Sequence, residues 1–87
     1  GIQGHCGRQV GPTQIWTKAL ADGGTAVALL NLNNHSMEMT ASFNELGLPA
    51  RVTARDLWRR ENLGTFDRKC GITVPAHGSV LVKMEKQ

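Results

Sequence analysis

The sequence predicts an all-β fold, an antiparallel β-sandwich or barrel of about seven to eight short strands. Three observations predict it. Short apolar or alternating segments recur about every ten residues, turns that contain glycine separate them, and no segment carries a long helical period. A chain of 87 residues forms one domain at most, and a domain of this size buries only about 60 to 65% of its unfolded surface.

Residues 25–32 are the stretch around which the chain is organised. They are almost continuously apolar, which is typical of a strand buried on both faces. Asp22-Gly23-Gly24 precedes them and supplies the glycines that a tight hairpin needs. Residues 14–20 lie on the other side of that turn and are the expected antiparallel partner.

The first thirteen residues contain four glycines and one proline, and they predict a loop or an irregular edge strand. The chain opens on Gly1-Ile2-Gln3-Gly4 without a methionine. We therefore expect a processed product or a piece of a larger protein.

Residues 33–36 have the composition of a turn, since asparagine tolerates the left-handed region. Residues 36–43 alternate, with Met37, Met39, Ala41 and Phe43 on one side, which predicts a strand with one wet face. Residues 44–48 end in Gly47 and precede a proline, so they hold at most one helical turn.

The second half predicts three or four further strands. Residues 52–58 form one, with Val52, Ala54 and Asp56 on the same face, and residues 59–64 form a polar turn. Residues 65–74 hold one or two strands with an interruption near Cys70-Gly71. Residues 75–78 form the turn before a last strand over 79–85.

Composition excludes several functions. The net charge is +3, and six of the ten basic residues lie between Arg51 and Lys69, but acidic residues are interspersed among them. This mixed pattern is typical of a solvated face, so we expect no nucleic-acid partner. No apolar run approaches the length of about 18 residues that a membrane span needs. The cysteines and histidines lack the paired spacing of a zinc site, and we expect no metal and no other cofactor.

Asp56 is the most interesting carboxylate, because it shares a face with apolar residues and precedes Leu57 and Trp58. A structural carboxylate, bonded to backbone amides or to a nearby arginine, is a more common reason for such a residue than catalysis. Cys6 and Cys70 are candidates for one disulfide, and two free thiols fit the sequence equally well.

Trp16 and Trp58 are the only tryptophans. Exposed and coplanar, they would form a platform on which sugar rings stack. As anchors in the core or in an interface, they would contribute their large apolar area. With no tyrosine to extend a platform, the anchoring role is preferred.

The order and spacing of several segments resemble the C-terminal domain of family 27 glycoside hydrolases, the α-galactosidases and α-N-acetylgalactosaminidases. The resemblance covers nearly the whole chain. It rests on a Trp-containing strand and turn over 16–23, an apolar strand ending in Asn over 26–31, LGL at 46–48, RDLW at 55–58, LGTF at 63–66 and PAHG at 75–78.

The resemblance implies an antiparallel β-sandwich with a Greek-key element, packed against a catalytic (β/α)₈ barrel of the same parent chain. In that family, two barrel aspartates carry out the retaining hydrolysis. None of the carboxylates of this chain matches those motifs, so no catalytic residue transfers. Residues 1–12 would be the lead-in from the missing barrel, and residues 13–87 the C-terminal sandwich domain.

The implied function is that of a non-catalytic accessory domain, which stabilises or positions the barrel of an α-galactosidase. Trp16 and Trp58 are then the expected interdomain contacts, and the exposed barrel-facing surface predicts self-association of the isolated domain. The alternative is an independent carbohydrate-binding module for galactosides, with Trp16 and Trp58 as its binding residues. An exposed pair within one ligand's length would favour that module.

Overall fold

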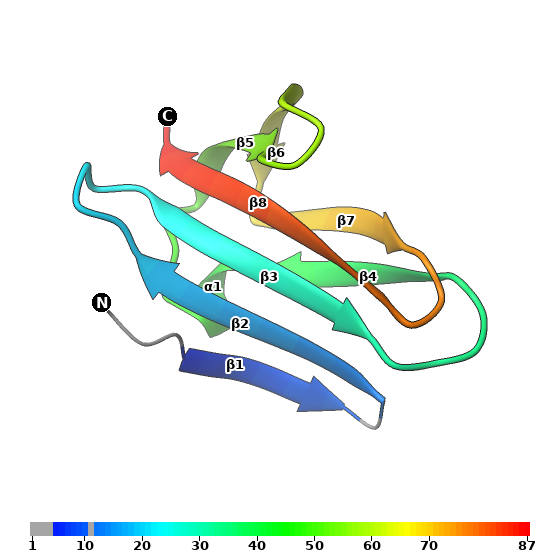
Figure 1. Ribbon diagram of the computed structural model, residues 1–87. Coiled ribbons are helices and arrows are strands. Elements are labelled where there is room, and N and C mark those ends of the chain that lie inside the picture. The colour runs from blue at the N-terminus through cyan, green and yellow to red at the C-terminus, as the bar shows by residue number, and fades with distance from the viewer. Residues whose placement is uncertain (1–4, 11) are drawn as a thin grey trace.

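The computed structural model describes the backbone of residues 5–10 and 12–87 and the side chains from residue 12 onward. The described residues form eight strands and one helical turn (Figure 1). In chain order they are β1 (His5–Val10), β2 (Thr13–Ala19), β3 (Thr25–Asn31), β4 (Met37–Ser42), α1 (Phe43–Leu46), β5 (Arg51–Asp56), β6 (Glu61–Asp67), β7 (Lys69–Val74) and β8 (Gly78–Lys86).

The strands form two antiparallel sheets that face each other across the core. The larger sheet has the order β1-β2-β3-β8-β5-β6, and the smaller one consists of β4 and β7. Figure 1 shows the larger sheet in front of the smaller one. The chain crosses to the smaller sheet between β3 and β4 and again between β6 and β7. It returns to the larger sheet at β5 and at β8, and β8 lies between β3 and β5. The predicted antiparallel sandwich with non-sequential, Greek-key strand order is confirmed.

The core lies between the two sheets. Alternate residues of β3, β5 and β8 point inward from the larger sheet, and Met39, Ala41, Cys70 and Val74 point inward from the smaller one. Phe43 enters from α1 and is fully buried. Gly47, with φ of 71°, ends this helical turn, as its position before a proline predicts.

Strand β3 differs from its predicted environment. Val27, Leu29 and Asn31 are fully buried, but Ala26, Ala28 and Leu30 on the opposite face are only half-buried. The prediction of a strand buried on both faces is therefore wrong for this chain by itself. Its inner face is in the core, and its outer face is apolar with no second layer of described residues upon it.

Two predicted boundaries in the second half are also wrong. The polar turn expected over 59–64 is shorter, because β6 already begins at Glu61 and contains Gly64. The interruption expected near Cys70-Gly71 lies instead at Arg68, whose φ of 69° turns the chain from one sheet to the other. Cys70 and Gly71 belong to a regular strand, paired with Ala41 and Thr40.

The N-terminal segment contributes an edge strand, one of its two predicted forms. β1 pairs with β2, and its register shifts between Cys6 and Arg8. The expectation that residues 1–12 are a lead-in from another domain falls partly on residues 1–4 and 11, which lie outside the described part of the chain.

Candidate functional site

The outer face of the larger sheet carries a row of apolar side chains that crosses four strands. Trp16 on β2 is opposite Ala28 on β3, and Ala28 is opposite Leu81 on β8. The row ends at Leu57, just beyond β5, whose N–H donates to the Leu81 carbonyl at 3.0 Å. Directly opposed residues on neighbouring strands contact one another, so these four form a continuous strip that we call the apolar row.

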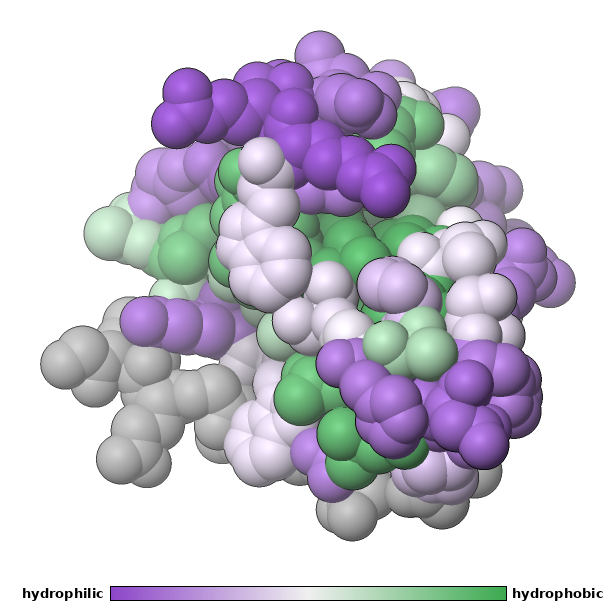
Figure 2. All heavy atoms as spheres, turned by 45° about the vertical axis from the view of Figure 1, so that its right-hand side comes forward, coloured by the Kyte–Doolittle hydropathy of each residue, from purple (hydrophilic) through white to green (hydrophobic). Residues whose placement is uncertain are grey.

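The apolar row lines a shallow depression of about 500 Å³. Leu20 and Ala26 extend its lining, and 37% of Trp16 is exposed. In Figure 2, hydrophobic atoms reach the surface in the middle of the view, below a band of hydrophilic side chains. The Trp16 indole N–H donates to Gln14 Oε1 at 3.0 Å, so the polar atom of the ring is already bonded and its apolar faces are left for contact.

A row of cations runs beside the apolar row, two residues further along each strand. Lys18 is opposite Ala26, which is opposite Lys83, which in turn is opposite Arg55. Lys83 is compensated within the chain, because it forms an ion pair with Asp22 and lies 3.5 Å from Glu85.

The Asp22–Lys83 pair joins the β2–β3 hairpin to β8. The hydrogen bond from Lys83 and the N–H of Gly24 lower the pKa of Asp22, and the bond to Asp22 raises the pKa of Lys83. Both groups are well hydrated, so this pair orients the hairpin more than it stabilises the fold.

Trp58 stands at the margin of this face, in the turn that follows β5. It is 63% exposed, the most exposed large hydrophobic side chain among the described residues. Asp56, buried at the end of β5, accepts hydrogen bonds from the N–H groups of Trp58 at 3.0 Å and Arg59 at 2.9 Å. One oxygen of its carboxylate is thus engaged with two backbone amides, as the structural interpretation of Asp56 expects.

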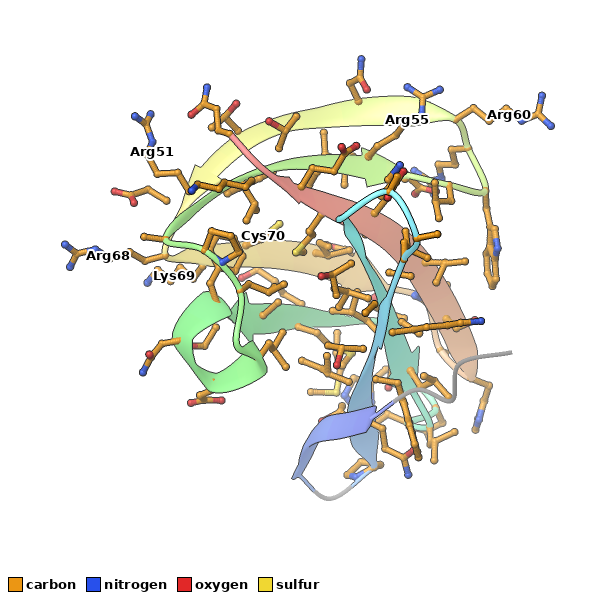
Figure 3. The ribbon with its side chains drawn as sticks, turned by 90° about the vertical axis from the view of Figure 1, so that its left-hand side faces the viewer. Arg51, Arg55, Arg60, Arg68, Lys69 and Cys70 are labelled. Atoms are coloured by element: carbon orange, nitrogen blue, oxygen red, sulfur yellow. The ribbon has the colours of Figure 1, made fainter. Side chains whose placement is uncertain are left out.

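The basic residues between Arg51 and Lys69 do not form one patch. Figure 3 shows Arg51, Arg68 and Lys69 at one end of the sandwich, with Arg55 and Arg60 at the other end. A phosphate backbone needs a continuous cationic track, and this division does not provide one.

Cys70 is a free thiol, buried between the sheets. Burial raises the pKa of its thiol to about 11, which makes it a poor nucleophile at neutral pH. Of the two alternatives that fit the sequence, the structure therefore has the free thiol at Cys70, and the side chain of Cys6 lies outside the described residues.

The described residues contain no group of three or more His, Cys, Asp or Glu side chains placed to hold a metal ion. Within the same part of the chain, no helix has the length and apolar character needed to cross a membrane.

The sequence analysis identified both tryptophans but missed Ala28, Leu57 and Leu81. The signal for them was present in the apolar character of both faces of residues 25–32 and in the uninterrupted run of Val80, Leu81 and Val82. A strand with one wet face would alternate, so apolar residues on the second face indicate a second contact.

The sequence of this chain is similar to those of several known proteins. Residues 10–84 match the family described as the alpha galactosidase C-terminal beta sandwich domain. An alpha-galactosidase of Coffea arabica is 32% identical over 89 residues, which cover 100% of this chain and 24% of the relative. A probable alpha-galactosidase of Dictyostelium discoideum is 28% identical, with 97% of this chain and 23% of the relative covered.

Solved structures give the same result. The alpha-galactosidase I of Mortierella vinacea matches with a TM-score of 0.87 and 29% identity over 97% of this chain and 23% of its own. A family 27 β-L-arabinopyranosidase of Geobacillus stearothermophilus, solved with arabinose, matches with a TM-score of 0.91 and 27% identity over 98% of this chain and 20% of its own. The chain therefore spans about a quarter of the length of the curated relatives that it matches first.

Proposed function

Because this chain belongs to the family of alpha galactosidase C-terminal beta sandwich domains, we propose that its outer sheet face packs against the catalytic domain of the same parent chain. The fragment is the non-catalytic accessory domain of a galactosidase-type glycoside hydrolase. Its work in this proposal is to stabilise and position the catalytic domain, and Trp16 and Trp58 belong to the contact.

The apolar row is the observation that carries the proposal. Trp16, Ala28, Leu81 and Leu57 form one strip across the sheet, and the described residues place no second layer over it. Contiguous apolar surface of this kind usually marks a contact with another protein surface. Relatives three to five times longer than the match carry additional chain that could provide the cover.

The parent protein, in this proposal, is a retaining α-galactosidase in which a (β/α)₈ barrel supplies both catalytic carboxylates. Residues 1–12 lead in from that barrel and residues 13–87 form the accessory domain. The name of the Coffea arabica relative supports the activity. The arabinopyranosidase that shares the sandwich carries the name of a different activity, which supports a proposal in which substrate choice belongs to the barrel.

A substitution on the apolar row tests the contact. Leu81→Glu places a charge in the centre of the strip, and burying that charge against the catalytic domain would be costly. We compare the 87-residue chain with a longer chain that also carries the catalytic domain. We expect the substitution to lower the thermal unfolding midpoint of the longer chain by several degrees and that of the 87-residue chain by much less. Ser36→Glu, at an exposed position in the turn between β3 and β4 and off the outer sheet face, is the matched control and should change neither midpoint. Equal losses from Leu81→Glu in both chains would contradict the interdomain contact.

The second candidate is an independent carbohydrate-binding module, and the exposure of both tryptophans favours it. Leu57, the neighbour of Trp58, lies three strand spacings from Trp16, about 14 Å, a distance that a single galactose cannot span and a short oligosaccharide can. Calorimetric titration of the 87-residue chain with galactose and a short galactomannan oligosaccharide decides between them. The accessory role predicts no binding heat, and saturable binding lost in Trp16→Ala and Trp58→Ala would favour the module.

A nitrophenyl α-galactoside assay on the same sample tests the absence of catalysis. We expect no turnover, because the buried Asp56 carboxylate is engaged with two backbone N–H groups. Turnover that co-purifies with the chain and disappears in Asp56→Asn would overturn this assignment.

A further inference from the structure

The turn of residues 57–60 is an exposed segment that several hydrogen bonds tie to the larger sheet. It begins at Leu57, inside the apolar row, and continues through Trp58, Arg59 and Arg60, all of which are exposed. Three large exposed side chains thus follow directly on Leu57 of the apolar row, and Arg59 also lines a separate depression with Asp56 and Phe66.

Two side chains at the end of β5, Arg55 and Asp56, form hydrogen bonds with the backbone of this turn. Asp56 accepts the N–H groups of Trp58 and Arg59 through one oxygen, Oδ1. Arg55 donates from Nη2 to the carbonyl of Arg60 at 3.1 Å and from Nη1 to Asn62 Oδ1 at 2.8 Å. The first and last residues of the turn are therefore both tied to the sheet, together with the bond from Leu57 N–H to Leu81.

Two features of this turn cost free energy. Arg60 adopts a φ of 57°, in the left-handed region that a non-glycine residue seldom occupies. The charged Asp56 side chain is buried, while Trp58, whose N–H it accepts, is exposed; burying a carboxylate is costly. Rigid, preorganised aromatic side chains are typical of the anchors that dominate protein interfaces.

We propose that the turn of residues 57–60 is the docking element that fixes the orientation of this domain on its catalytic domain. Trp58 enters an apolar recess of the catalytic domain, and Arg59 and Arg60 meet carboxylates at the rim of that recess. Asp56 and Arg55 are positioning residues that hold the turn ready. This inference rests on the proposed interdomain contact and adds to it a specific element and the chemistry of its partner surface.

Charge supports an acidic partner surface. The chain carries a net charge of +3, and neither Arg59 nor Arg60 forms an ion pair with a carboxylate of the described residues. Arg51, Arg68 and Lys69 lie at the opposite end of the sandwich from Arg60 (Figure 3), so Arg60 does not belong to their cluster. An aromatic anchor with arginines at its border is the composition enriched in interface cores.

Hydroxyl-radical footprinting with mass spectrometry tests the element directly, because tryptophan is readily oxidised and both tryptophans are identified by their peptides. The 87-residue chain is compared with the longer chain that carries the catalytic domain. We expect Trp58 and Trp16 to lose most of their oxidation rate in the longer chain. Protection of Trp16 alone would overturn the docking role of the turn and leave the interdomain contact intact, and protection of neither would contradict the interdomain contact itself.

Substitutions in the longer chain test the positioning role. Asp56→Ala removes the acceptor, and Asp56→Asn keeps an oxygen at the same place. We expect Asp56→Ala to restore the oxidation of Trp58 while Trp16 remains protected, and Asp56→Asn to preserve the protection of both. A purely structural role of Asp56 would expose both tryptophans together or neither, and either result would overturn the inference.

A pair of double variants tests the charge of the partner surface. Arg59→Gln with Arg60→Gln removes two cations beside Trp58, and Arg51→Gln with Arg68→Gln is the matched control at the far end. Each pair contains one residue with positive φ, Arg60 or Arg68, so backbone effects are balanced. We expect only the first pair to lower the thermal midpoint of the longer chain and to reduce its dependence on salt. Equal effects from the two pairs would contradict a carboxylate rim around Trp58.

Discussion

Asn31 is a fully buried polar residue whose side chain links the turn after β3 to the end of β7. It is fully buried at the end of β3, yet its side-chain amide satisfies four backbone groups. Nδ2 donates to the carbonyls of His35 at 2.9 Å, Val74 at 3.1 Å and Pro75 at 3.3 Å, and Oδ1 accepts from Asn33 N–H at 2.9 Å. One side chain thus joins the β3–β4 turn of the larger sheet to the end of β7 in the smaller one.

We expect Asn31→Ala to lower the free energy of unfolding by about 2 kcal/mol, because it leaves buried carbonyls without donors. Urea denaturation of the 87-residue chain measures this loss. Asn34→Ala, in the same turn but exposed, is the matched control. Its free energy of unfolding should stay within about 0.5 kcal/mol of that of the unsubstituted chain. A loss no larger than that of the control would mean that water replaces the amide.

Cys70 predicts how stability depends on alkaline pH. Burial raises the pKa of its folded thiol to about 11, above the ordinary value of 9.0, so the unfolded chain loses this proton first as the pH rises. Stability from the protonated thiol is complete below pH 9 and falls as the pH rises toward 11. One pKa unit corresponds to about 1.4 kcal/mol, which is the expected loss between pH 8 and pH 10.

Denaturation at the two pH values measures that loss, and Cys70→Ala supplies the reference. The difference in stability between the unsubstituted chain and the variant separates the effect of Cys70 from that of the lysines, which also titrate in this range. If the stability of the unsubstituted chain depended on pH in the same way as that of Cys70→Ala, the pKa of the Cys70 thiol would not change on folding. Thiol counting in denaturant on the same sample checks the free state of Cys70, because a Cys6–Cys70 disulfide would yield no free thiol.

Among the elements, the β5–β6 hairpin depends on a glycine within a strand. Gly64 is opposite Ala54, where the register of the hairpin shifts, and its φ is 109°. This backbone conformation is accessible almost only to glycine. The bulge bends the hairpin just before Asp56 and the turn that carries Trp58.

We expect Gly64→Ala to cost about 2 kcal/mol of unfolding free energy, because alanine strains the backbone at this φ. Gly71→Ala in β7 is the matched control, since its φ is not positive and an added Cβ would lie 3.4 Å from the nearest heavy atom, a side-chain carbon of Glu38. Chemical denaturation of the two variants should separate them clearly. Similar values for both would indicate that the hairpin relaxes around residue 64.

The sequence predicted most elements because local chemistry determines them. The turn at Asp22-Gly23-Gly24, the alternation of β4 and the helical turn that ends at Gly47 need only neighbouring residues. The sheet change at Arg68 was missed because it places an arginine at positive φ, which local preference disfavours. Residue 64 was assigned to a turn because an isolated glycine signals a turn and a bulge equally.

The candidate site was predicted only in part, for a related reason. Both tryptophans were identified by type, and the resemblance supplied their expected partner. Their neighbours on the apolar row come from four strands, and their alignment depends on a register that no local pattern specifies. The role of Asp56 as an acceptor for two backbone amides likewise required coordinates.

At the scale of the whole molecule, the apolar row predicts how the 87-residue chain behaves by itself. Trp16, Ala28, Leu81 and Leu57 remain in contact with water when no catalytic domain covers them. Two copies can remove this surface from water by stacking their outer faces. Lys18 and Arg55 in the neighbouring row oppose such pairing, because like charges would meet across a symmetric contact.

We therefore expect weak self-association that strengthens with salt, since screening reduces the repulsion between cations while the apolar contact persists. Sedimentation velocity over a range of chain concentrations, at low and at high salt, measures it. Leu81→Glu should remain monomeric under all of these conditions. Ser36→Glu, in the turn between β3 and β4 and off the outer sheet face, should behave like the unsubstituted chain. Association that weakened with salt, or that survived Leu81→Glu, would place the self-contact on another face and remove this support for an apolar docking surface.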